Sequence, residues 1–161
     1  QAMMPELTAL FAPTVNSYRR LVPGLWAPTV ANWGIDNRTC ALRALPGSEK
    51  AVRVEHRLPG ADCNPYLALA AAIASGLHGI EHQMDPGSPV DGNAYAEVFP
   101  EERQLPRSLE EAGARFAAST MARDWFGDVF VDHLAASRDW EVREAQKYVS
   151  DWELSRYFEL I

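Results

Sequence analysis

The hydrophobic pattern of this chain changes its period once, near residue 62. Upstream, residues 29–35, 39–45 and 51–58 are short segments rich in β-branched, aromatic and aliphatic side chains, bounded by Pro, Gly, Asp and Asn. Downstream, apolar residues recur at helical spacing, at Leu67, Ala70, Ala71, Ala74, Leu77 and Ile80. Strands followed by helices predict an α+β fold, and the brief turns predict that the three strands form an antiparallel meander.

Helix boundary signals organise the rest of the chain. Asn64 and Pro65 are typical of the N-cap and the first position of a helix. Because this helix is apolar almost all round, we expect it to be buried on most sides. Residues 85–106 predict a long surface loop, a capping box at residues 108–111 predicts the start of another helix, and residues 129–158 predict a further helix.

The composition is that of an ordinary globular domain. The chain has 161 residues, enough for one domain with its own core. Its formal net charge of −7 argues against general binding to nucleic acids or anionic membranes. No signal peptide is visible and no apolar run is long enough to span a bilayer, so we expect a cytoplasmic protein. Cys40 and Cys63 are too few for a disulfide framework, and we expect two small buried thiols.

The first residues of the chain indicate missing sequence upstream. Residues 1–5 (QAMMP) are not a convincing translation start, and an apolar pattern is already established at residues 7–11. We therefore expect residues 1–161 to form the C-terminal portion of a longer protein.

Basic residues gather between residues 16 and 58, which hold seven of the fifteen lysines and arginines. In the third predicted strand, Arg53, Glu55 and Arg57 occupy alternate positions and therefore share one face. One interpretation is a solvated sheet face with internal ion pairs. The other is an anion site, where arginine forks bind phosphate or carboxylate and the single carboxylate binds Mg²⁺ or Mn²⁺, as phosphoryl transfer requires.

Four short motifs follow one another along this region. They are NSYRRLVPG at residues 16–24, NRTCALR at 37–43, KAVRVEHR at 50–57 and NPYL at 64–67. In order and spacing they resemble the NSYKRLVPG, NRSxxxR, KxxRxExR and ANPYL segments of glutamine synthetases. The resemblance implies a catalytic domain whose sheet wraps into a half-barrel with helices outside. It also implies a reaction in which ATP and glutamate form γ-glutamyl phosphate and an amine then displaces the phosphate.

The resemblance also implies roles for individual residues. Arg20 and Arg57 are expected to bind the carboxylates of glutamate. Arg38 and Arg43 are expected to contact the phosphates of ATP and to stabilise the transferring group, while Lys50 is expected to lie near the nucleotide. Each of these roles agrees with the positive charge of the region.

Glu55 is expected to be one ligand of the divalent metal. Arg53 either orients Glu55 or takes no part in the site, and Arg19 stands where the family usually has lysine and is expected to be structural. The family's glycine-rich nucleotide motif, its metal-binding histidine and its other metal-binding carboxylates are not in this sequence. We expect them upstream, with a small β-grasp domain that completes the site of a neighbouring subunit in a homo-oligomeric ring. The 161-residue chain alone is therefore expected to be inactive.

One position departs from the family pattern. Ammonia-using enzymes have an acid in the segment PGxEAP, whereas this chain has Trp26 in PGLWAP at residues 23–28. Tryptophan cannot accept a proton, but its face can hold a cation or cover an apolar amine chain. The sequence therefore resembles the γ-glutamylpolyamine synthetase branch, with a polyamine or another primary amine as acceptor. Three alternatives stay open: a Trp26 that only packs in its loop, an ammonia-using glutamine synthetase, and a non-catalytic relative with an assembly or regulatory role.

Two other groups of residues have simpler interpretations. His78 and His82 are four residues apart on a predicted helix, but no third metal ligand stands out, so we expect a pair on the helix surface. Trp125, Trp140 and Trp152 are expected to be packing anchors.

Overall fold

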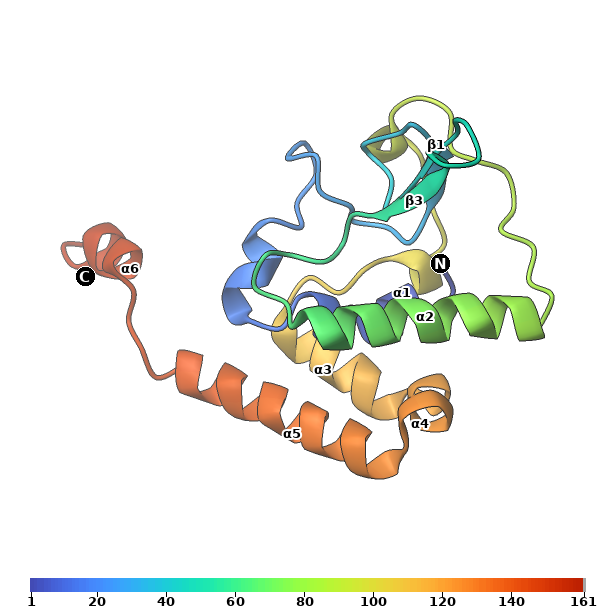
Figure 1. Ribbon diagram of the computed structural model, residues 1–161. Coiled ribbons are helices and arrows are strands. Elements are labelled where there is room, and N and C mark those ends of the chain that lie inside the picture. Colours follow the sequence, from blue (N-terminus) through green and yellow to red (C-terminus); the bar gives the residue numbers. More distant parts are fainter. Residues whose placement is uncertain (161) are drawn as a thin grey trace.

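The computed structural model describes residues 1–160 and has the predicted α+β architecture. A small sheet lies to one side of a layer of helices (Figure 1). The elements are α1 (Met4–Phe11), η1 (Val15–Arg19), β1 (Trp33–Ile35), β2 (Leu42–Leu45), β3 (Arg53–His56), α2 (Pro65–Glu81), η2 (Ala94–Ala96), η3 (Glu101–Arg103), α3 (Leu109–Ala118), α4 (Thr120–Phe126), α5 (Asp128–Ala145) and α6 (Asp151–Tyr157).

The core forms around α1, which packs against α2 and α3, while α5 packs on α3. Helix α1 is buried on almost every side, and Leu7 and Phe11 are fully enclosed. Phe116 of α3 occupies the same cluster. The ring of His56 lies 4.6 Å from the ring of Phe11, so β3 rests directly on α1. This contact fixes the sheet relative to the helices.

The three strands are arranged in the order β1-β2-β3, but only one pair is antiparallel. β2 and β3 pair antiparallel as predicted, whereas β1 and β2 run parallel, with Trp33 opposite Leu42. The predicted meander is therefore wrong at its first turn. The reason is local: the side chain of Asn32 accepts a hydrogen bond from the amide of Ala41 at 2.9 Å, and the Asn32 carbonyl accepts one from Leu42 at 3.0 Å. Because of these bonds, β2 begins beside the start of β1 and not beside its end. The two strands therefore run in the same direction.

Helix α2 begins where the sequence predicts. The side chain of Asn64 caps it by accepting from the amide of Tyr66 at 2.9 Å, and Pro65 is its first residue. The predicted burial is wrong for the described chain, because only Ala71 and Ala74 are buried. A row of large apolar side chains faces outward, namely Tyr66, Leu69, Ile73, Leu77 and Ile80. Among the described helices, α2 packs mainly against α1, and Trp125 of α4 also reaches it at His78.

Residues 129–158 form two helices where one was predicted. Helix α5 ends at Ala145, and α6 begins after a capping box in which Ser150 and Glu153 bond each other's backbone amides. The S-x-x-E signal at 150–153 was visible in the sequence. At the start of α3 the predicted box is half formed, because Ser108 accepts from the amide of Glu111 but Glu111 accepts from Arg107.

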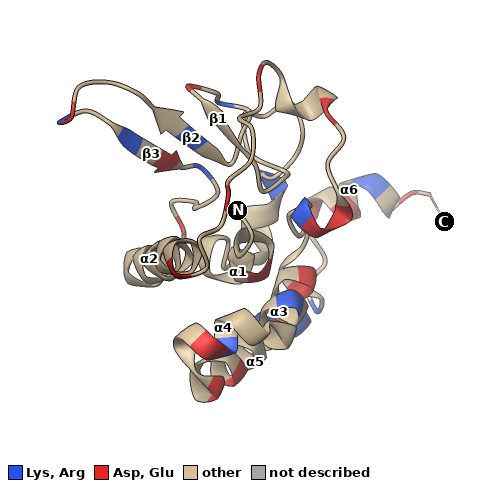
Figure 2. Cartoon of the chain, turned by 90° about the vertical axis from the view of Figure 1, so that its right-hand side faces the viewer, with Lys and Arg blue, Asp and Glu red and all other residues tan. Residues whose placement is uncertain are grey.

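Helix α6 stands apart from the body in Figure 1 and has no buried residue. Within residues 1–160, no helix combines the length and the apolar character needed to cross a membrane. Figure 2 shows basic positions along β2 and β3, on the same strands that carry the motif arginines.

Candidate active site

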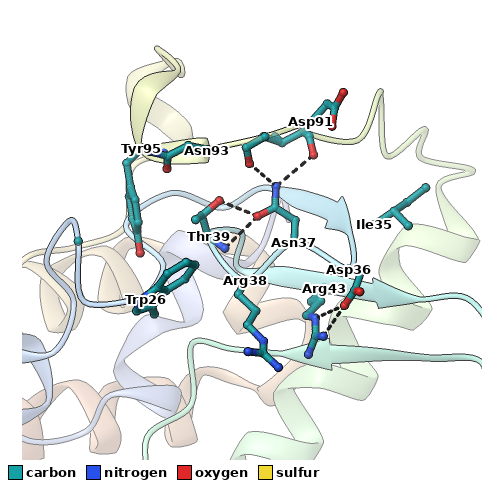
Figure 3. Close-up of a pocket in the computed structure, with 13 residues that line it drawn as sticks. Trp26, Ile35, Asp36, Asn37, Arg38, Thr39, Arg43, Asp91, Asn93 and Tyr95 are labelled. Carbon is teal, nitrogen blue, oxygen red and sulfur yellow. Dashed lines mark hydrogen bonds and ion pairs between the residues drawn. The ribbon is translucent and has the colours of Figure 1, made fainter.

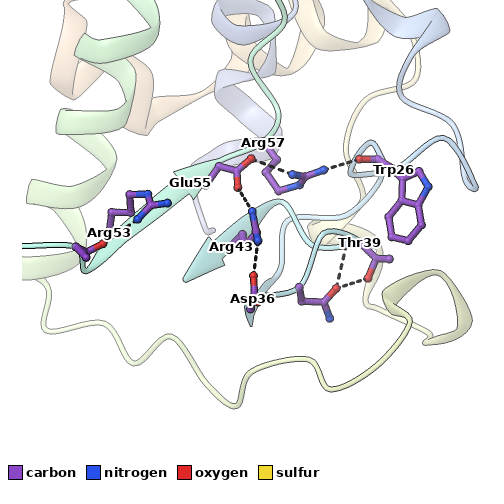
Figure 4. A network of polar contacts seen from close by, with 9 residues as sticks. Trp26, Asp36, Thr39, Arg43, Arg53, Glu55 and Arg57 are labelled. Atoms are coloured by element: carbon purple, nitrogen blue, oxygen red, sulfur yellow. Dashed lines mark hydrogen bonds and ion pairs between the residues drawn. The ribbon is translucent and has the colours of Figure 1, made fainter. Parts of the chain in front are cut away.

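The antiparallel pairing of β2 with β3 places three charged side chains together on one face of the sheet. Arg43 lies directly opposite Glu55 in the register. One Glu55 carboxylate oxygen accepts from Arg43 Nη1 at 2.8 Å, and the other accepts from Arg57 Nη1 at 2.9 Å. Arg43 also bonds Asp36, with Nε to Oδ1 at 2.9 Å (Figure 4). Alternation along β3 predicted the shared face, and the structure confirms that Glu55 and Arg57 meet there.

The opposite charges of this cluster stabilise each other's ionised forms. The hydrogen bond from Arg43 lowers the pKa of Glu55 from its ordinary value, and Arg57 adds to the effect. The same bond, with that to Asp36, raises the pKa of Arg43. Glu55 is therefore ionised at neutral pH. Its side chain is 39% exposed, whereas those of the two arginines are 16% and 14% exposed, so a ligand can reach the carboxylate from the open side.

The cluster contains one carboxylate, that of Glu55, whose chemistry can be compared with the expected role of a divalent-metal ligand. Glu55 is an ionised and partly exposed oxygen donor, which suits Mg²⁺ or Mn²⁺. In the part of the chain that the structure describes, no group of three or more His, Cys, Asp or Glu side chains is close enough to hold an ion. Glu55 therefore fits the role of a single ligand, and the remaining ligands would come from elsewhere.

A pocket of about 800 Å³ opens beside this cluster. Trp26, Arg38 and Arg43 line one side, and the segment around Tyr95 lines another (Figure 3). Arg38 is exposed, so its guanidinium is available to an anion. The pocket thus brings two of the predicted phosphate-binding arginines next to the predicted acceptor-site tryptophan.

Two predicted site residues, Arg20 and Lys50, belong neither to this pocket nor to the charged cluster beside it. Arg20 donates from Nη1 to the carbonyl of Arg57 at 3.4 Å and from Nη2 to the carbonyl of Leu58, so it braces the end of β3. Lys50 is exposed in the turn between β2 and β3 and is not among the lining residues. Arg53 donates to the carbonyl of Ala51 at 2.9 Å and has no hydrogen bond or ion pair with Glu55.

Trp26 occupies an unusual backbone conformation at the end of its loop. Its φ is +56°, in the left-handed region that non-glycine residues rarely adopt. The indole is 63% exposed, and the Trp26 carbonyl accepts from Arg57 Nη2 at 2.8 Å. The loop is thus tied to the arginine that also holds Glu55. The sequence predicted a role for Trp26 but gave no sign of this link.

Asn37 and Tyr95 were missed as site residues. Asn37, treated as a turn signal and as part of a motif, accepts from the amide of Thr39 at 2.9 Å and donates to the carbonyls of Val90 and Gly92 at 3.2 and 2.8 Å. Asn37 therefore holds residues 90–92 in the wall of the pocket. The partner segments are more than fifty residues away in sequence, and no local pattern could have indicated them.

The histidine pair behaves as expected for a helix surface. The rings of His78 and His82 stack with centroids 4.0 Å apart, and Trp125 donates to His78 Nδ1 at 3.2 Å. The prediction of packing anchors is confirmed for Trp125, which packs against the core, but it is wrong for Trp140 and Trp152, which are 55% and 64% exposed.

The cysteines are both free thiols. Cys40 is buried, and burial raises its pKa to about 11, so it stays protonated at neutral pH. Cys63 is only half-buried, which corrects the expectation of two buried thiols.

Comparison with known proteins decides the family. Residues 1–157 match the family described as glutamine synthetase, catalytic domain. The chain belongs to the glutamine synthetase family. It is 46% identical over 161 residues to the glutamate–isopropylamine ligase of a Pseudomonas species and 44% identical over 162 residues to type-1 glutamine synthetase 2 of Dictyostelium discoideum. These alignments cover 99% of this chain but only 35% and 31% of the relatives.

A solved structure has a similar fold. A complex of GmaS with ADP is 35% identical and superposes with a TM-score of 0.81, covering 98% of this chain and 38% of that one. The α+β arrangement therefore matches part of the glutamine synthetase catalytic domain. The chain spans about a third of the length of these relatives.

Proposed function

We propose that the protein carrying this chain is an ATP-dependent ligase that joins the γ-carboxyl group of glutamate to an amine. The observation that carries the proposal is the Arg43–Glu55–Arg57 cluster beside the Trp26 pocket, at positions that match the family motifs. Several arginines around one ionised carboxylate form a site for anions and one divalent ion. We further propose that residues 1–161 form the C-terminal portion of the catalytic domain, and that the whole protein assembles as a homo-oligomeric ring.

The reaction has two steps. A γ-carboxylate oxygen of glutamate attacks the terminal phosphorus of ATP, the bond to the bridging oxygen breaks, and ADP leaves. The nitrogen of the amine then attacks the acyl carbon of γ-glutamyl phosphate, the carbon–oxygen bond to phosphate breaks, and the nitrogen loses a proton. Arg38 and Arg43 stabilise the negative charge of the transferring phosphoryl group, and Lys50 adds positive charge near the nucleotide.

The residues proposed to bind glutamate and the divalent metal lie in or next to the same cluster. Arg57 lies on the sheet face and binds a carboxylate of glutamate, and Arg20, behind the end of β3, is proposed to assist it. Glu55 contributes one ligand to Mg²⁺ or Mn²⁺, which when bound neutralises charge on the ATP phosphates. Because this chain offers one carboxylate of that site, we propose that the 161-residue chain alone is inactive. ADP release by the purified chain with ATP, Mg²⁺, glutamate and an amine would contradict this.

The acceptor is proposed to be a polyamine or another primary amine rather than ammonia. Trp26 has no acid–base function, and its exposed indole offers an apolar and cation-binding face at the pocket. A relative whose name specifies isopropylamine supports an acceptor larger than ammonia. The similarity to a type-1 glutamine synthetase favours the alternative, an ammonia-using enzyme. A non-catalytic relative is the third possibility.

One assay separates these functions. The natural protein that carries this sequence is incubated at its full length with ATP, Mg²⁺ and glutamate, and ADP release is measured with ammonia, isopropylamine, ethanolamine, putrescine or spermidine. We expect turnover with at least one organic amine to exceed turnover with ammonia. Best turnover with ammonia would replace the proposal with a glutamine synthetase, and no ADP release with any acceptor would favour the non-catalytic relative.

A further inference from the structure

The loop that carries Trp26 is held from two sides at its end. The hydroxyl of Tyr95 donates to the carbonyl of Ala27 at 2.8 Å, across 68 positions of sequence. The preceding carbonyl, that of Trp26, accepts from Arg57 at 2.8 Å. Two consecutive carbonyls are therefore fixed by side chains from two different elements, η2 and the end of β3. Together these bonds set the direction in which the indole leaves the backbone.

The backbone of Trp26 needs such support. A left-handed φ of +56° is unfavourable for a residue with a bulky side chain, and it persists only where the surroundings hold it. The indole itself is 63% exposed, so packing of the side chain does not supply the support. The support comes from the hydrogen bonds that the carbonyls of Trp26 and Ala27 accept.

Tyr95 is itself anchored to the motif loop. The side chain of Asn93 caps η2 by accepting from the amide of Tyr95 at 3.1 Å, and the amide of Ala94 donates to Thr39 Oγ1 at 2.9 Å. Ala94 is buried. Burial also raises the pKa of Tyr95, so the phenol keeps its proton at neutral pH and remains a donor. The segment that carries Tyr95 is thus fixed to the turn around residue 39. Its hydroxyl links that turn to the loop that carries Trp26.

Tyr95 and Trp26 line the same pocket (Figure 3). We propose that Tyr95 is a positioning residue that holds the Trp26 loop in place and thereby sets the affinity for the organic amine acceptor. The inference rests on the proposed ligase function. Because Tyr95 acts through the carbonyl of Ala27, we expect its loss to change acceptor binding more than the binding of ATP or glutamate.

The test compares Tyr95→Phe with the wild type in the full-length natural protein. The change keeps the ring and removes only the donor. We expect KM for the preferred organic amine to rise about fivefold, the effect of losing one ordinary hydrogen bond, while KM for ATP and for glutamate stays within twofold. Tyr148→Phe is the matched control, because Tyr148 is 79% exposed and its hydroxyl makes no hydrogen bond within the described residues.

A second readout is independent of turnover. Protein labelled with 5-fluorotryptophan gives one ¹⁹F resonance per tryptophan, and Trp26→Phe identifies the resonance of Trp26. We expect Tyr95→Phe to shift or broaden that resonance and Tyr148→Phe to leave it in place.

The outcomes separate the inference from the proposed function. A Tyr95→Phe protein with an unchanged Trp26 resonance and an unchanged amine KM would overturn the inference while leaving the ligase intact. If the wild-type protein forms no amide with any amine, the proposed function fails and the acceptor role falls with it. A displaced Trp26 resonance would in that case support only the structural link between the two residues.

Discussion

Acidification is expected to destabilise this fold through the buried ring of His56. His56 lies on the inner side of β3, opposite the charged face, with its ring 4.6 Å from that of Phe11. Burial lowers its pKa from 6.5 to about 4. The folded protein therefore keeps His56 neutral down to about pH 4, whereas the unfolded chain protonates it below about pH 6.5. Above pH 6.5 both states are neutral and the histidine has no pH effect.

The size of this effect follows from the difference between the two pKa values. Between pH 6.5 and 4 the unfolded state binds one more proton than the folded state, so the free energy of unfolding falls as the pH falls. The full difference corresponds to about 3 kcal/mol, and about 2 kcal/mol of it is lost by pH 5. Hydrogen bonds from Arg43 and Ser17 lower the pKa values of the carboxyl groups Glu55 and Asp62, respectively.

Urea denaturation at pH 7 and pH 5 measures the effect. We expect the wild type to lose about 2 kcal/mol more between these pH values than the His56→Leu variant, which cannot be protonated at this position. His133→Gln is the control, because His133 is exposed and the variant should keep the pH dependence of the wild type. Equal losses in the wild type and in His56→Leu would refute the reasoning, because they would place the titrating group elsewhere.

Three further substitutions test other parts of the account. Glu55→Gln removes the charge of the proposed metal ligand, and we expect kcat of the full-length protein to fall by about two orders of magnitude or more in a steady-state ADP assay. Gly34→Ala would place a Cβ 2.8 Å from the carbonyl of Val90, so thermal unfolding should show a loss of about 1–3 kcal/mol; an unchanged Tm would argue against that close approach. Ser150→Ala removes the cap of α6, and hydrogen exchange should report about 1 kcal/mol less protection there, with no change in α3.

Some features that depend only on neighbouring residues were predicted correctly from the sequence. Asn64 and Pro65 start α2 as expected, because a cap depends only on the residues around it. The alternation along β3 correctly placed Glu55 and Arg57 on one face, because side chains two positions apart share a face of a strand. The motifs correctly indicated the family, and the comparisons confirm it. The individual site roles stay predictions.

Features that depend on distant partners were not predicted. The parallel pairing of β1 with β2 depends on Asn32 bonding the chain again at Ala41, which an apolar pattern does not indicate. Tyr95 reaches Ala27 only through the tertiary fold. The exposure of α2 was missed for a similar reason: its sequence is apolar all round, but burial depends on which neighbours are present.

The central claim is that glutamate is activated by phosphorylation before an amine attacks it. The most direct test supplies the full-length natural protein with ATP, Mg²⁺, an organic amine and glutamate labelled with ¹⁸O in the γ-carboxylate, and examines both products by mass spectrometry. The account predicts a γ-glutamyl amide and inorganic phosphate that carries one ¹⁸O atom per amide formed. An amide accompanied by unlabelled phosphate would contradict the acyl-phosphate step, and labelled phosphate with ammonia as the only productive acceptor would contradict the proposed acceptor.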